Sequence, residues 1–223
     1  MLCWASKVKV KICDIRTVED ALMAVRLGAD AVGVLVGQRY ASPDFLKVDI
    51  ARDIVSALPP FCSSVLVTHL RHAIEILPLL DHVPVTTVQL HSDISPEDCS
   101  ALKQRHPNRK YIKSIHVIDE TSLHIQDPYL DIVDALLLDT VNPSTGQIGG
   151  TGLAHDWSLS ARLVASSPLP VILAGGLTAD NVNSAIARVH PFGVDVNSGV
   201  KNTEGLKDPV KVSHFIQRAK SAM

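Results

Sequence analysis

The sequence predicts an α/β protein, a single (β/α)8 barrel of the TIM-barrel type that spans residues 1–223. Short apolar segments alternate eight times with segments of helical periodicity. The length suits a compact, undivided barrel, and no shift in composition marks a domain boundary. Polar residues and glycines follow the apolar segments, where the active sites of such barrels form. An open, doubly wound sheet of eight strands is the alternative architecture.

The first four units each pair a short apolar strand with a helix. Strands are predicted at 7–13, 31–36, 65–68 and 85–90, with helices at 17–28, 48–58, 73–80 and from 95 onward. Thr17 and Ser95 are typical helix N-caps, because their hydroxyls accept from backbone N–H groups of the first turn. Pro96 suits the first helical position, where its missing N–H is not needed.

The last four units repeat this order. Strands are predicted at 111–115, 132–138, 170–174 and 193–196, with helices at 120–125, from 156, up to 189 and at 209–220. The second of these helices follows a long glycine-rich loop, and the first is short. Eight strand and helix pairs in one chain are the pattern of a closed barrel.

Composition excludes several classes of partner. The net charge of −2 and the absence of a Lys/Arg cluster argue against nucleic acid and anionic membrane surfaces. No apolar run is long enough to span a bilayer, and lysines interrupt the first residues where a signal peptide would be apolar. Four cysteines without paired spacing predict reduced thiols in the cytoplasm. Nothing local indicates an oligomeric state.

Glycine-rich turns follow the sixth, seventh and eighth predicted strands. In barrels, backbone N–H groups of the last loops commonly hold a phosphate. The candidate phosphate-binding residues are Gly150, Gly152, Gly175, Gly176, Ser198 and Gly199. Ordinary helix caps and tight turns are the alternative interpretation. A phosphorylated small molecule is therefore the expected partner.

Two reactive groups lie at predicted strand ends, Cys13 after the first strand and Asp139 in the sixth. On a barrel they would face each other across the mouth. A thiolate takes a proton from carbon and a carboxylic acid gives one to oxygen, so the pair suffices for an aldose-to-ketose isomerisation without a cofactor. The alternative is a buried structural cysteine and a capping aspartate.

Several motifs together resemble the phosphoribosylanthranilate isomerase family of tryptophan biosynthesis. They are Lys11-Ile-Cys-Asp-Ile-Arg-Thr17, Gln89-Leu-His91, Leu137-Leu-Asp139, Gly149-Gly-Thr-Gly152, Leu173-Ala-Gly-Gly-Leu177 and Gly193-Val-Asp-Val-Asn-Ser-Gly-Val200. The resemblance implies an Amadori rearrangement of a phosphoribosylamine, with Cys13 as general base and Asp139 as general acid. It also implies that His91 and the glycine turns hold the phosphorylated substrate, and that no cofactor is used.

The chain departs from that family pattern in the first motif and in the loop after the second strand. Asp14 follows the cysteine where the family has glycine, and its charge is expected to raise the pKa of the thiol. The resemblance implies that an arginine directly after Ser-Pro binds the anthranilate carboxylate. This chain has Asp44 at that position. Arg39, a few residues earlier, is the alternative cation.

Histidines at successive strand ends suggest a second hypothesis. His69, His91 and His116 with Asp14 or Asp139 have the donors of a zinc or iron site, as in a metal-dependent phosphosugar epimerase or hydrolase. The preferred interpretation is that these rings bind substrate hydroxyls or cap the rim, with no metal. Asp195 is a further rim candidate. A paralogue acting on another phosphoribosyl substrate and a non-catalytic phosphometabolite-binding protein are the remaining hypotheses.

Overall fold

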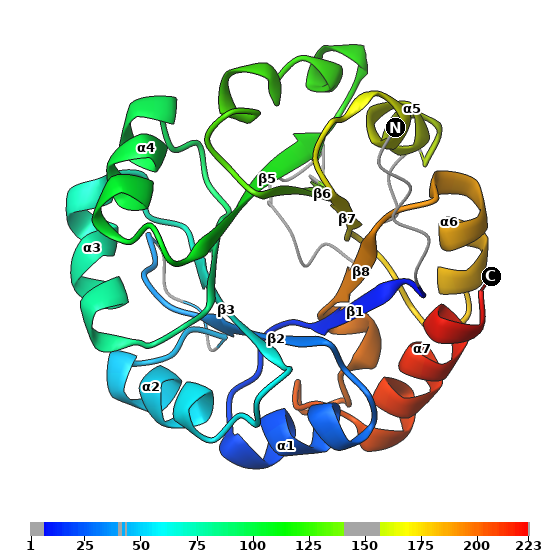
Figure 1. Cartoon of the computed structure of the whole chain (residues 1–223). Coiled ribbons are helices and arrows are strands. Elements are labelled where there is room, and N and C mark those ends of the chain that lie inside the picture. The colour runs from blue at the N-terminus through cyan, green and yellow to red at the C-terminus, as the bar shows by residue number, and fades with distance from the viewer. Residues whose placement is uncertain (1–6, 40–41, 43, 141–156, 223) are drawn as a thin grey trace.

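The structure, a computed structural model, describes residues 7–39, 42, 44–140 and 157–222. Eight parallel strands form a closed barrel in the order β1 to β8, and helices surround it (Figure 1). The closing pair is β1 with β8, where Lys9 is opposite Gly193 and Lys11 is opposite Asp195. The predicted barrel is confirmed, and the open sheet is excluded.

The strands lie close to their predicted positions and differ by a few residues at their ends. They are β1 (Lys9–Ile12), β2 (Ala31–Leu35), β3 (Ser63–Thr68), β4 (Thr87–Leu90), β5 (Lys110–Val117), β6 (Ala135–Thr140), β7 (Val171–Leu173) and β8 (Gly193–Val196). Because β5 extends to Val117, His116 lies inside this strand and not beyond its end. Backbone pairing with β6 extends the strand, with His116 opposite Asp139.

The helices form the outer ring. They are α1 (Val18–Arg26), α2 (Val48–Ser56), α3 (Ala73–His82), α4 (Pro96–Arg105), α5 (Trp157–Ser166), α6 (Val182–Val189) and α7 (Pro209–Ser221). The predicted caps are confirmed, because Thr17 accepts from Asp20 N–H and Ser95 accepts from Asp98 N–H. None of the described helices has the length and apolar character needed to cross a membrane.

The short helix predicted near residues 120–125 is present, but it is a 3-10 helix and not an α-helix. Two short 3-10 segments, η1 (Glu120–Leu123) and η2 (Asp127–Tyr129), follow β5. Asp119 caps η1 by accepting from Thr121 N–H, and Ser122 Oγ accepts from the N–H groups of Ile118 and Asp119. Tyr129 ties the segment to the body of the barrel by donating to the carbonyl of Ile94.

Successive side chains of each strand point to opposite faces, and they pack into two separate apolar layers. Val10, Ile12, Leu136 and Leu138 belong to the main core between the strands and the helices. Cys13, Val67, Ile112 and Leu137 belong to two smaller clusters made of the opposite faces of the strands. The chemistry-bearing residues share the second set of faces, so the barrel brings them together at its mouth.

Candidate active site

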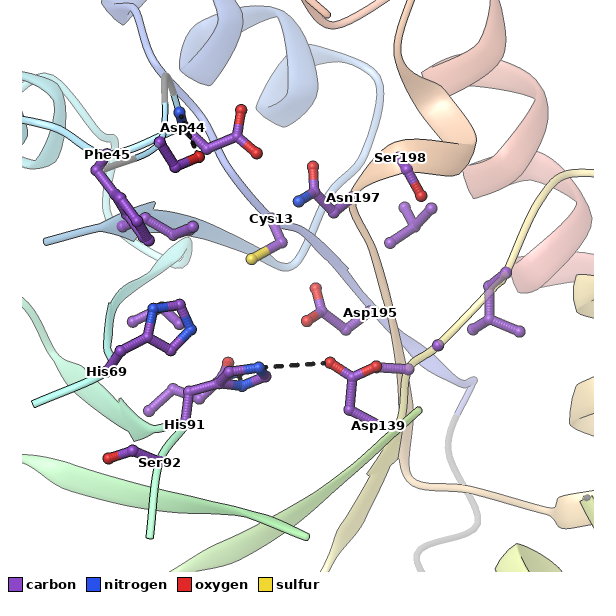
Figure 2. A pocket seen from close by; sticks show the side chains of 18 of the residues that line it. Cys13, Asp44, Phe45, His69, His91, Ser92, Asp139, Asp195, Asn197 and Ser198 are labelled. Carbon is purple, nitrogen blue, oxygen red and sulfur yellow. Dashed lines mark hydrogen bonds and ion pairs between the residues drawn. The ribbon is translucent and has the colours of Figure 1, made fainter. Parts of the chain in front are cut away.

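A cavity of about 680 Å³ opens beside the C-terminal ends of the strands. Its lining includes Cys13, Asp139, Asp195, His69, His91, Gly175, Gly176, Ser198 and Arg39 among the predicted residues. Figure 2 shows Cys13, Asp195 and Asp139 directed into the same space from β1, β8 and β6. The barrel therefore brings together most of the residues that the sequence singled out.

Cys13 lies at the end of β1 and is 7% exposed. Gly33 on the adjacent strand leaves room for it, since a Cβ at that position would lie 3.2 Å from the sulfur. Burial raises the pKa of the thiol to about 11, and Asp195 and Asp14 add to the rise, while Lys11 and Lys207 oppose it. The predicted effect of Asp14 on the thiol is present, although burial is the larger cause.

Lys11 is the nearest strong cation on the same face of β1. Its ammonium donates to Asp195 Oδ2 at 2.8 Å, and both side chains are buried. Burial lowers the pKa of Lys11, but Asp195 and Cys13 outweigh burial, so the net pKa is raised and the group stays charged. Sequence reasoning missed Lys11, although its spacing of two from Cys13 places both on one face of the strand.

Asp139 is the penultimate residue of β6 and is buried. The backbone N–H of Thr140 donates to Asp139 Oδ1 at 2.7 Å, and His91 Nε2 lies 3.7 Å from Oδ2. Burial raises the pKa of the carboxyl to about 7, with the Thr140 hydrogen bond opposing the rise. A carboxyl group with this pKa is partly protonated near neutral pH, as a general acid requires.

His91 is held between polar neighbours from β4 and β5. Its Nδ1 lies 3.1 Å from Ser114 Oγ and 3.3 Å from Gln89 Nε2. Burial lowers the pKa of this ring well below 6.5, so it is neutral at physiological pH. The structure places it beside Asp139, where it can orient that carboxyl group. Its predicted role as a substrate or phosphate ligand stays a prediction.

The rings of the other two candidate histidines, His69 and His116, contact the His91 ring in an edge-to-face arrangement. Ring centroids are 4.9 Å apart for His69 and His91 and 5.2 Å apart for His91 and His116. His116 Nε2 lies 3.0 Å from the carbonyl of His91, and His116 is not among the cavity-lining residues. In the part of the chain that the structure describes, no group of three His, Cys, Asp or Glu residues could hold a metal ion.

The turns after β7 and β8 approach each other closely. Gly175 and Gly176 have φ of 83° and 63°, in the left-handed region that favours glycine. A Cβ on Gly199 would collide with the carbonyl oxygen of Leu177, so this contact requires glycine. Gly176 and Ser198 line the cavity, whereas Gly199 serves the contact between the turns. The candidates Gly150 and Gly152 lie outside the described residues.

Asp14 and Asp44 share one cation that the sequence did not reveal. Lys201 Nζ lies 2.6 Å from Asp14 Oδ2 and 3.1 Å from Asp44 Oδ1. Asp14 has φ of 58°, a left-handed conformation that aspartate tolerates better than most residues. Asp44 is thus a paired carboxylate, while Arg39 is exposed and lines the cavity beside it.

Comparisons with known proteins identify the same family that the motifs suggested. The family model for N-(5'-phosphoribosyl)anthranilate (PRA) isomerase matches residues 10–218. N-(5'-phosphoribosyl)anthranilate isomerase 2 of Methanosarcina mazei is 46% identical over 213 residues, covering 96% of this chain and 94% of its own. The isomerase of Geotalea uraniireducens is 44% identical, covering 95% of this chain and 98% of its own.

Solved structures agree with the sequence relatives. Phosphoribosyl anthranilate isomerase from Thermotoga maritima superposes with a TM-score of 0.83 at 37% identity, covering 96% of this chain and 98% of its own. A phosphoribosyl anthranilate isomerase in complex with reduced 1-(o-carboxyphenylamino)-1-deoxyribulose 5-phosphate has a TM-score of 0.81 at 35% identity, with the same coverage. The chain is therefore an isomerase of the N-(5'-phosphoribosyl)anthranilate isomerase family, as its motifs predicted.

Proposed function

We propose that this chain converts N-(5'-phosphoribosyl)anthranilate into 1-(o-carboxyphenylamino)-1-deoxyribulose 5-phosphate in tryptophan biosynthesis. Cys13 is the general base and Asp139 is the general acid. The observation that carries these roles is the convergence of the two groups on one cavity, from β1 and β6. Membership of the family and the reduced product bound to a related isomerase support the substrate.

The reaction begins with a proton transfer to oxygen. Asp139 donates its proton to the furanose ring oxygen, the bond from that oxygen to C1 breaks, and the nitrogen lone pair forms a protonated Schiff base. The Cys13 thiolate then takes the C2 proton, and the electron pair forms a C1–C2 double bond as the nitrogen becomes neutral. The resulting enolamine becomes the ketose when C1 gains the proton held by the Cys13 thiol and the C2 hydroxyl gives its proton to the Asp139 carboxylate, which restores both groups. No net proton is gained or lost.

The steps require a protonated Asp139 carboxyl and a Cys13 thiolate at the same time. With pKa values of about 7 for Asp139 and about 11 for Cys13, the pair holds one proton over the intervening pH range. These values place that proton mainly on Cys13, so the reactive form, with the proton on Asp139 and a thiolate on Cys13, is the minor one. Lys11 favours this form, because its ammonium lowers the pKa of the thiol.

The other parts of the cavity suit the remaining groups of the substrate. Backbone N–H groups of the turns at Gly175, Gly176 and Ser198 would hold the phosphate. Arg39 lines the cavity near Phe45 and is the cation that we assign to the anthranilate carboxylate. Phe45 and His69, whose rings meet edge-on at 5.4 Å, offer an apolar wall for the anthranilate ring.

Kinetic analysis of single variants tests the assigned roles. We expect Cys13→Ser and Asp139→Asn each to lower kcat by roughly 10²- to 10⁴-fold on N-(5'-phosphoribosyl)anthranilate, with affinity for the reduced product nearly unchanged. Cys99→Ala is the matched control, because Cys99 is a buried cysteine on α4, outside the cavity. Parental kcat in Cys13→Ser or Asp139→Asn would contradict the roles.

We also place the enzyme in the cytoplasm. Cys13, Cys62 and Cys99 are free thiols, as expected of a reducing compartment. Expressing the chain in cells with a fluorescent tag and locating the tag tests this placement.

A further inference from the structure

Lys201 joins three segments that are distant in the sequence. It follows η3 (Ser198–Val200), and its ammonium contacts Asp14 after β1 and Asp44 in the loop between β2 and α2. The exposed fractions of these side chains are 15% for Lys201, 0% for Asp14 and 28% for Asp44. A cation shared by two carboxylates at these depths fixes the positions of all three groups.

The backbone of Lys201 is itself held firmly. It forms a bridge with Lys207, and the ammonium of Lys211 donates to its carbonyl at 2.7 Å. Arg16 donates to the carbonyl of Gly205 at 2.6 Å, which ties this segment to the end of β1. These contacts hold the backbone of Lys201 in place, and its ammonium in turn holds the Asp44 side chain.

The charges around Lys201 indicate what its ammonium does for substrate binding. The proposed substrate has a phosphate and a carboxylate, so acidic side chains at the cavity would repel it. Asp44 lines the cavity, and Asp14 directly follows Cys13. Lys201 faces both, and Arg16 lies 4.0 Å from Asp44. Together these cations balance the two carboxylates.

The pKa of Lys201 is consistent with this arrangement. Burial lowers the pKa of the ammonium, but hydrogen bonding and attraction from Asp14 and Asp44 outweigh burial and raise it overall. Burial raises the pKa of Asp14, and Lys201 and Lys207 oppose that rise. Lys201 thus stays charged and keeps Asp14 nearer to its ionised state.

We propose that Lys201 is a positioning residue and not a phosphate ligand: it neutralises Asp14 and Asp44 together and holds Asp44 near the end of β8. This proposal rests on the proposed function for its effect on substrate binding. Lys201 lies near Ser198 in the chain and lines the cavity, so direct phosphate binding is the competing role. A phosphate would have to displace two carboxylates already in contact with the ammonium.

Removing the partners of Lys201 separates the two roles. We expect Lys201→Met to raise KM for N-(5'-phosphoribosyl)anthranilate about tenfold, because Asp44 is left unbalanced beside the substrate. The triple variant Lys201→Met, Asp14→Gly, Asp44→Asn removes both carboxylates with the cation. We expect its KM to return to within about twofold of the parent, and its affinity for inorganic phosphate, measured by calorimetry, to match the parent. Gly at position 14 suits the left-handed backbone there.

Lys110→Met is the matched control, because Lys110 begins β5, at the opposite end of its strand from the cavity, and its side chain is 70% exposed. A triple variant that keeps both the raised KM and a weakened affinity for phosphate would overturn the proposal and assign Lys201 to the phosphate.

Thermal unfolding tests the same contacts without substrate. We expect Lys201→Met to lower Tm by about 5 °C and the triple variant to regain most of that loss, since no carboxylate is then left unpaired. An equal loss of Tm in the two variants would overturn the proposal. A parent inactive on N-(5'-phosphoribosyl)anthranilate would instead contradict the proposed function, and the unfolding comparison would still test the role of Lys201.

Discussion

The mouth of the barrel has two halves, and buried polar groups are stabilised in a different way in each. The charged half, at the ends of β1, β2 and β8, consists of Lys11, Asp14, Asp44, Asp195 and Lys201. In it each carboxylate lies against a lysine, as at 2.8 Å for Lys11 and Asp195. The imidazole half, at β3, β4 and β5 and the loop before α2, consists of Phe45, His69, His91 and His116. Its rings contact one another edge-on.

The difference lies in how each half avoids the cost of a buried charge. The charged half pairs each charge with one of opposite sign. The rings of the imidazole half are uncharged, because burial lowers the pKa of His69 to about 4 and that of His91 well below its usual range. Asp139 stands where the halves meet, facing the neutral ring of His91. Burial raises its pKa to about 7, and Asp195 adds to the rise, while Thr140 and Lys11 oppose it.

Breaking the buried pair of the charged half should have the largest effect. Lys11→Met leaves Asp195 without its cation in the barrel and removes the ammonium that lowers the thiol pKa of Cys13. We expect a loss of about 3–5 kcal/mol in the free energy of unfolding, measured with urea, together with a large fall in kcat.

Lys9→Met is the matched control, two residues away on the same strand. Its pair with Asp30 is 3.4 Å long, and the Lys9 side chain is 49% exposed. We expect a loss below about 1 kcal/mol and unchanged kcat. Equal losses in the two variants would show that the charged half does not depend on its buried pair.

The next largest effect is expected at Asp139, and its size depends on pH. Because burial raises the pKa of Asp139 to about 7, the folded state holds this proton more tightly than the unfolded state does. Its contribution to stability is therefore full below about pH 4 and is lost as the pH rises through about 7. We expect Asp139→Asn to be more stable than the parent at pH 8, by on the order of 3 kcal/mol, although it loses activity.

Urea unfolding of the parent and Asp139→Asn at pH 5 and pH 8 measures this difference. The gain should be smaller at pH 5, where the parental carboxyl is already protonated in the folded state. A gain that is independent of pH would mean that the carboxyl group is not the source.

The smallest effect is expected in the imidazole half. His116→Phe keeps a ring against His91 but removes the hydrogen bond to the His91 carbonyl. We expect a loss of about 1 kcal/mol in stability and a change in kcat below about threefold, because His116 is not among the cavity-lining residues. Urea unfolding measures the first, and kinetics with and without a chelator measure the second. A hundredfold loss that tracks a bound metal would revive the metal-dependent hypothesis.

The order of strands and helices could be predicted from the sequence because it depends on local periodicity. Alternating strands such as β1 and capped helices such as α4 obey rules that act over a few residues. The short helix after β5 was also predicted, but not its 3-10 type or the second segment η2, where Tyr129 donates to the carbonyl of Ile94, 35 positions away. Cys13 and Asp139 were found because barrel topology places strand ends at one rim.

The sequence by itself thus determined the barrel, its helix caps and the residues at its mouth, because each follows from short-range patterns and one closure rule. Only the tertiary structure decided which charges meet. Lys11 and Asp195 are 184 positions apart, and Lys201 reaches Asp44 across 157 positions. Such contacts exist because β8 closes on β1, and no periodicity within the chain encodes which side chain will face which after closure.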